Sequence, residues 1–125
     1  MEESQRKYDL EERLIVFALL IIQIVELLPN TKAGNHIGGQ LIRSGTSPSF
    51  NYGEAQAAES RNDFIHKMKV CLKDLRETKI SLFIIKRKPL INEIGIGDKT
   101  LKECEELIAI FSKSIDTAQK NKSKK

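Results

Sequence analysis

The sequence predicts an all-α domain in which four helices pack as an antiparallel, up-and-down bundle. Three observations support this prediction. Four segments carry apolar side chains at alternating spacings of three and four residues, which is the period of a helix with one buried face. Pro29 and Pro89 end the first and third segments, and short connections between helices favour antiparallel neighbours. No segment alternates apolar and polar residues as a half-buried strand does.

The first segment, at about 9–28, is more apolar than a single buried face requires. Between 14 and 28 only Gln23 and Glu26 interrupt the apolar run. A bilayer span needs about 20 apolar residues, so this stretch is not expected to cross a membrane. A helix that is apolar all round is buried on more than one side. We therefore expect the bundle to form a homo-oligomer through the apolar face of this helix that its bundle neighbours leave uncovered.

The second segment, at about 31–58, is the hardest to assign. Thr31 is a good N-cap, but the segment contains several glycines and Pro48, which disfavour a helix interior by about 1 and 3 kcal/mol each. Helical spacing nevertheless persists, with small residues that let a facing helix approach closely. We predict a helix kinked at Pro48. The stripe consists of Ile37, Leu41, Ser44, Pro48, Asn51, Ala55 and Ala58.

The third and fourth segments show the clearest periodicity. Ser60 and Asp63 resemble a capping box, and the third helix is expected to end at the basic run 86–88. A loop at 90–97 then leads to Asp98, the expected N-cap of the fourth helix. The predicted core stripes are Phe64, Met68, Cys71, Leu75, Thr78, Leu82 and Ile85 in the third helix, and Leu101, Cys104, Ile108, Phe111, Ile115 and Ala118 in the fourth.

The size of the chain is consistent with one domain. A length of 125 residues allows a core without help from disulfides or metals. We expect residues 1–125 to form this single domain, with short flexible ends at about 1–8 and 119–125. Cys71 and Cys104 lie far apart in a chain with no secretory leader pattern, so a cytoplasmic protein with reduced thiols is expected.

Four polar residues lie on or beside inward stripes, where an unpaired charge is costly. We predict that they form a structural network across helices and fix their register, with a ligand site as the alternative. These residues are Arg43, Asn51, Glu54 and Glu77.

Positive charge is concentrated in one helix. The formal net charge is +4, and residues 61–88 hold nine basic and three acidic side chains. Within that segment Lys69, Lys73 and Arg76 can share the solvated face. The sequence suggests a nucleic-acid contact that uses the phosphate backbone, and an ordinary solvated face is the alternative. The candidate residues are Lys69, Lys73, Arg76, Lys86, Arg87 and Lys88.

No catalytic, cofactor or metal motif is recognisable. A di-iron bundle needs two Glu-x-x-His motifs, and the only near match is Asp63 with His66. Cys71 and Cys104 fall on core stripes, where cysteine acts as a small apolar residue. The glycine-rich run 34–39 lacks the Lys-Ser/Thr ending of a phosphate loop, so close helix packing explains it better. We expect no catalytic residues, no cofactor and no metal, and therefore no enzyme.

Three blocks, at 41–55, 60–67 and 72–78, resemble the bacterial 23S rRNA intervening-sequence family, whose members are often labelled ribosomal proteins. The resemblance implies a four-helix bundle assembled as a homopentamer, with some members encoded inside insertions in large-subunit rRNA genes. It also implies that Arg43, Asn51, Glu54 and Glu77 are signature positions. The family is similar to the basic pentameric accessory proteins of diversity-generating retroelements, which bind nucleic acid and a reverse transcriptase.

Two functions follow as expectations. The first is a non-enzymatic oligomeric adaptor that binds RNA, or an RNA-bound protein, through basic faces. The second is a protein-interaction scaffold that binds no nucleic acid.

Overall fold

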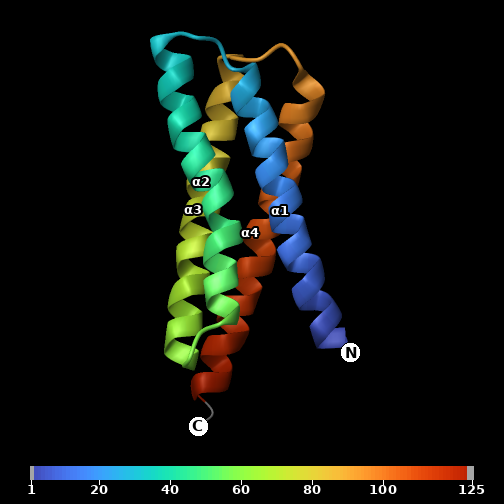
Figure 1. The fold of residues 1–125 in the computed structure, drawn as a ribbon, viewed down its shortest axis with the longest axis vertical. Helices are drawn as coiled ribbons and strands as arrows, with labels where there is room; N and C mark the ends of the chain where they lie inside the picture. Colours follow the sequence, from blue (N-terminus) through green and yellow to red (C-terminus); the bar gives the residue numbers. More distant parts are fainter. Residues whose placement is uncertain (1, 124–125) are drawn as a thin grey trace.

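The computed structural model describes the backbone of residues 2–123 and the side chains of 9–93 and 95–121. Those residues form four α-helices and no strand, which confirms the all-α prediction. In Figure 1 the α1–α2 and α3–α4 connections lie at one end of the molecule, and the α2–α3 connection lies at the other. The helices are α1 (Glu2–Leu27), α2 (Lys32–Gln56), α3 (Arg61–Arg87) and α4 (Ile94–Ser123).

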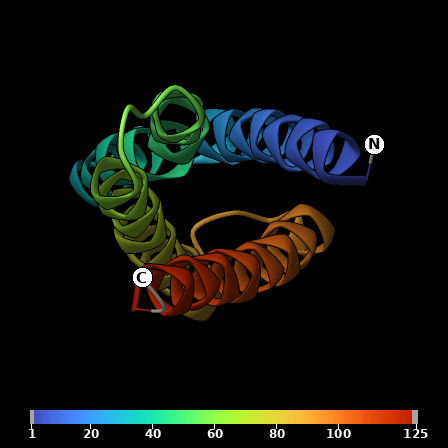
Figure 2. The ribbon, with the colours of Figure 1, turned by 90° about the horizontal axis from the view of Figure 1, so that it is seen from below.

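The helices are arranged so that α1 and α3 occupy diagonal corners. The backbone of α1 is adjacent to that of α2, α2 to α3, α3 to α4 and, least extensively, α1 to α4, whereas the described parts of α1 and α3 are not adjacent. Figure 2 shows α1 and α4 separating on the side away from α3. The outer faces of α1 and α3 therefore point to different sides of the bundle.

The core draws on all four helices. Phe17, Leu41, Leu75 and Phe111 are each fully buried, one from each helix. The predicted stripes of α3 and α4 are confirmed, since their members are buried or partly buried against this core. Tyr52 of α2 packs edge-on against Phe111, with ring centres 6.0 Å apart.

The helix α2 runs unbroken through Pro48, which confirms the predicted helix, while the kink at Pro48 stays a prediction. At two of its glycines, a neighbouring side chain already occupies the space that a side chain on α2 would need. A Cβ on Gly45 would lie 2.6 Å from Ile21 Cγ1 of α1, and one on Gly38 would lie 3.3 Å from Leu28 Cδ1. Close packing, rather than phosphate binding, thus explains these glycines. By contrast, Gly39 and Gly53 face open space.

A pair of buried hydroxyls joins α2 to α3, four residues before Pro48 in α2. Thr78 Oγ1 lies 2.8 Å from the Asp74 carbonyl oxygen and 2.9 Å from Ser44 Oγ. A hydroxyl has one proton and a carbonyl can only accept, so Thr78 donates to Asp74 and accepts from Ser44. The pair is almost completely buried, and its hydrogen bonds satisfy both side chains.

The helix ends confirm two caps and correct one. Thr31 Oγ1 accepts from Gly34 N, and Ser60 Oγ accepts from Asp63 N, each at 3.0 Å. The prediction that Asp98 caps α4 was wrong, because α4 already begins at Ile94 and Asp98 instead pairs with Lys86 at 3.2 Å. The helices also extend into the segments 1–8 and 119–125, where flexible ends were expected, while residues 1, 124 and 125 lie outside the described part.

Within the described residues, no helix combines the length and the apolar character that a membrane span requires.

Candidate functional site

The basic hollow is a shallow depression on the outer face of α3. Lys69, Lys73 and Arg76 line it together with Leu72, Glu77 and Ile80. The three basic side chains are exposed, and no ion pair between described residues involves them. Glu77 is engaged by Arg43, which leaves the hollow positively charged. Three unpaired cations on one helix face can contact an anion such as a nucleic-acid backbone.

The other three predicted basic residues do not join this hollow. Lys86 turns toward α4 and pairs with Asp98. The Arg87 guanidinium lies over the Phe83 ring, 5.0 Å from its centre, and Lys88 forms the C-cap of α3. Arg87 is eleven residues beyond Arg76, which is roughly 16 Å along the helix. The structure therefore brings Lys69, Lys73 and Arg76 together and separates them from Lys86, Arg87 and Lys88.

Apolar side chains lie between these two basic groups. Ile80 is 61% exposed and Ile84 is 42% exposed, with Phe83 partly buried beside them. They line a second hollow with Arg87 and Lys88. The outer face of α3 thus combines exposed apolar residues with positive charge, a composition more typical of a contact surface than of a purely solvated helix face.

The four signature residues lie at the α2–α3 junction, and they form separate contacts. Arg43 Nη2 donates to Glu77 Oε2 at 2.8 Å and Arg43 Nη1 lies 3.7 Å from Asp74, whereas Glu54 pairs with Lys67 at 2.8 Å. Asn51 donates to the Ser47 carbonyl within its own helix. Arg43 and Glu54 are exposed and Asn51 and Glu77 are partly buried, so the pairs line the edge of the junction and do not enter the core.

Arg43→Met tests the larger of these contacts. Burial and the neighbouring Glu77 raise the pKa of Asp74, and Arg43 opposes that rise. Without Arg43, the pKa of Asp74 should rise further in the folded protein, so keeping this carboxyl ionised costs the folded state more. We expect the variant to be less stable than the original protein at pH 7, and the difference to shrink as pH falls and Asp74 is protonated.

Urea unfolding at pH 7 and at mildly acidic pH measures this change. Arg76→Met is the matched control, because Arg76 carries the same charge on an exposed position of α3 without an ion pair among the described residues. Equal stability of the Arg43 variant and the control at pH 7 would show that the junction does not depend on these contacts.

The outer face of α1 is apolar and exposed. Five side chains on this face, from 38% to 59% exposed, face neither the core nor another helix: Ile15, Val16, Leu19, Ile22 and Leu27. The basic residue nearest to them, Arg13, turns to α4, where it makes a two-point contact with Glu103 at 2.8 and 3.0 Å. Isolated apolar residues are normal on surfaces, but a contiguous row of this kind marks a contact site.

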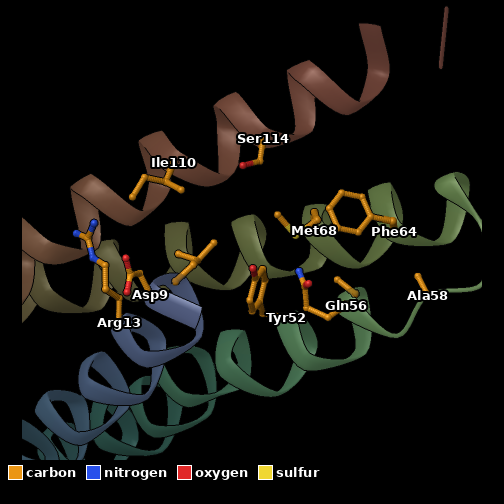
Figure 3. Close-up of a pocket in the computed structure, with 11 residues that line it drawn as sticks. Asp9, Arg13, Tyr52, Gln56, Ala58, Phe64, Met68, Ile110 and Ser114 are labelled. Atoms are coloured by element: carbon orange, nitrogen blue, oxygen red, sulfur yellow. The ribbon is translucent and has the colours of Figure 1, made fainter. Parts of the chain in front are cut away.

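A pocket of about 600 Å³ opens between the helices where α1 leaves α4. Its lining is shown in Figure 3 and includes Leu10, Phe64, Met68 and Ile110, with Gln56 and Ser114 as polar members. Tyr52 is buried at its edge, and this burial raises the pKa of its phenol. The charged residues Asp9 and Arg13 also line the pocket, and its lining includes no cysteine or histidine. This pocket was not predicted from the sequence, because its lining residues come from four separate helices.

The thiols and imidazoles do not come together as a reactive site. Cys71 and Cys104 are fully buried, as the stripes predicted, and burial raises the pKa of each thiol to about 12. Cys104 Sγ donates to the Leu75 carbonyl at 3.3 Å. His36 and His66 are both exposed. Among residues 9–93 and 95–121, no three His, Cys, Asp or Glu side chains are placed to share a metal ion.

Comparison with known proteins places this bundle among solved structures. A crystal structure of a protein of unknown function from the S23 ribosomal protein family of Bacteroides thetaiotaomicron is similar, with a TM-score of 0.78 and 27% sequence identity. The match covers 88% of this chain and 97% of that chain. A comparison with curated proteins finds no match.

The family model described as 23S rRNA-intervening sequence protein matches residues 6–113, which is most of the chain and includes α2, α3 and most of α1 and α4. The match agrees with the resemblance carried by the blocks around Arg43 and Glu77. This chain therefore belongs to the 23S rRNA-intervening sequence protein family.

Proposed function

We propose that this protein is a non-enzymatic, homo-oligomeric adaptor that associates with RNA in the cytoplasm. In this proposal the antiparallel bundle assembles with other copies through the outer face of α1. The basic hollow of α3, formed by Lys69, Lys73 and Arg76, then contacts nucleic acid. The exposed apolar row on α1 is the observation that most directly supports the proposal, because burying this row against another copy would be favourable.

The energetic argument for assembly follows from the exposed area of that row. Its side chains retain about half of their exposure in the isolated chain, from 38% for Ile22 to 59% for Leu19. Full burial of such a side chain is worth about 1.5–3 kcal/mol, so covering the remaining half contributes roughly 1 kcal/mol each. Covering all five therefore contributes several kcal/mol toward offsetting the free-energy cost of association. By family resemblance the expected assembly is a pentamer.

Assembly also strengthens a weak contact with nucleic acid. A single hollow with three cations makes few phosphate contacts, and binding by one copy is correspondingly weak. A ring presents the same hollow several times, and linked contacts raise the overall affinity without new contacts. The binding is expected to be insensitive to base sequence, because the hollow offers charge and no aromatic stacking surface.

RNA binding is tested by replacing the hollow's three basic residues together, as Lys69→Ala, Lys73→Ala and Arg76→Ala. We expect at least a tenfold loss of affinity for single-stranded RNA in a filter-binding titration at low salt. The slope of log affinity against log salt should also become shallower by about 2, given about 0.7 for each phosphate contact. A variant with Lys99, Lys102 and Lys113 replaced by Ala removes the same charge from α4 and should keep most of the affinity.

The result that overturns the RNA proposal is an absence of binding by the original protein at low salt. One observation favours the second candidate, a scaffold for protein partners: Ile80 and Ile84 are exposed within the α3 face. Native mass spectrometry of protein purified gently without nuclease separates the two functions. Retained RNA supports the adaptor, and an RNA-free assembly that holds one stoichiometric protein partner supports the scaffold.

A further inference from the structure

We infer that the outer face of α1 in one copy packs against the outer face of α3 in the next copy, in a head-to-tail contact. The inference rests on the proposed self-assembly and identifies the second surface that takes part. Here the α3 outer face means Ile80, Phe83, Ile84 and Arg87, which line the second hollow of this helix.

The two faces match in apolar character. Leu19 at 59% and Ile80 at 61% are the most exposed large aliphatic side chains of their helices. Ile22 follows Leu19 and Phe83 follows Ile80 at the same spacing of three residues. Packing one face on the other would cover both groups at once, whereas contact with a purely polar partner would leave one of them uncovered.

The charges of the two faces are opposite. Exposed acidic residues, Glu12 and Glu26, flank the apolar row of α1. The exposed Arg87 lies at the C-terminal end of the apolar group of α3. A contact of α1 with α1, or of α3 with α3, would oppose like charges, which disfavours that pairing. Contact between the two different faces brings together Glu26 and Arg87, which carry opposite charges.

The spacing along the helices also agrees. Glu26 lies one residue before the end of α1, and Arg87 is the last residue of α3. Figure 1 shows α1 and α3 ending at the same end of the molecule, at Leu27 and Arg87. Leu19 lies eight residues before its helix end and Ile80 seven before its own, a difference of about 1.5 Å along the axis. A neighbouring copy can therefore pack side by side without sliding along the bundle.

The position of the two faces determines the kind of assembly. Because α1 and α3 stand at diagonal corners of the bundle, one copy can use both faces at the same time. A contact between two different faces does not close as a two-fold pair. It continues from copy to copy and gives a ring if the rotation closes. The original protein should therefore form an assembly of more than two copies.

Complementary blocking variants test the head-to-tail contact. Leu19→Asp blocks the α1 face, and Ile80→Asp blocks the α3 face. Both positions are mostly exposed, so circular dichroism should show folded helices for each variant. By size-exclusion chromatography with light scattering, we expect each variant alone to lose the assembly. A mixture at high concentration should give a one-to-one heterodimer, because one intact α1 face then meets one intact α3 face.

The control is Phe50→Asp, which replaces the most exposed large apolar residue, on α2, and should leave the assembly unchanged. If Ile80→Asp assembled normally while Leu19→Asp did not, the head-to-tail contact would be overturned. Self-assembly through α1 would then still stand. A monomeric original protein would overturn the proposed self-assembly itself, so the two failures are distinguishable.

A charge exchange tests the pairing in the complete assembly. Glu26→Arg and Arg87→Glu should each weaken the assembly by at least tenfold in midpoint concentration. The two substitutions in one chain should restore it, because each contact then regains one opposite pair. Glu26 and Arg87 lie away from the basic hollow, so RNA binding per copy does not confound this measurement. A double variant that assembles no better than either single one would overturn the inferred pairing.

Discussion

Gly45→Val is expected to remove most of the stability of this bundle. A Cβ at this position would lie 2.6 Å from Cγ1 and 2.7 Å from Cγ2 of Ile21, which are distances that real Cβ atoms do not show. Ile21 is fully buried, so its side chain cannot turn aside without displacing the core. Overpacking a core costs about 1–3 kcal/mol for modest additions. Valine adds three carbons here, so we expect a loss above about 3 kcal/mol in the free energy of urea unfolding.

Gly53→Ala is the matched comparison within the same helix. A Cβ at Gly53 meets nothing within 4 Å, and alanine favours a helix interior over glycine by about 1 kcal/mol. We expect this variant to be more stable than the original protein by about 0.5–1 kcal/mol. If the two substitutions changed the free energy of unfolding equally, Gly45 would not be required for close contact between α2 and α1.

These two positions show which parts of the fold could be predicted from the sequence. The helical spacing of α2 predicted a helix, whereas the helix propensity of its residues favoured a loop. Propensity is a local property, and it does not include the packing of neighbouring side chains against Gly38 and Gly45. The sequence could not distinguish Gly45 from Gly53, since the difference lies in Ile21 of another helix. The N-cap of α4 was misplaced for a similar reason, as Asp98 has the local chemistry of a cap but is engaged by Lys86 of α3.

The candidate site was predictable to the extent that it lies on one helix. Lys69, Lys73 and Arg76 share a face of α3 because of helical spacing alone, and the structure places them in one hollow. The pairing of Lys86 with Asp98 required knowledge of α4, and the pocket beside Tyr52 required all four helices. Predictions from spacing hold within an element and fail where side chains from different elements meet.

The two cysteines should resist alkylation in the folded protein. The pKa of each thiol is about 12, where a thiol of ordinary environment has 9.0. Only the thiolate reacts, and at pH 8 its fraction falls by about a thousandfold for such a shift. We expect iodoacetamide to label native Cys71 and Cys104 at least about a thousandfold more slowly than in concentrated urea. Lys69→Cys, on the exposed face of α3, supplies a control thiol that should react at an ordinary rate. Rapid labelling of one native cysteine would reveal local opening of the bundle at that helix.

The same thiols make the stability of the bundle depend on pH in the alkaline range. Their pKa is higher in the folded state, so the folded state keeps protons that the unfolded state releases. This contribution is fully present below pH 9, the ordinary thiol value, and is lost as pH rises toward 12. Each thiol should lower the free energy of unfolding by about 1.4 kcal/mol per pH unit within that interval. Replacing both cysteines with alanine reduces the stability at pH 7 by leaving small cavities, but it should flatten the decline between pH 9 and 12. A variant that declines as steeply as the original protein would assign the alkaline loss to groups other than these thiols, with the buried Tyr52 phenol, whose pKa is also raised, as the next group to replace.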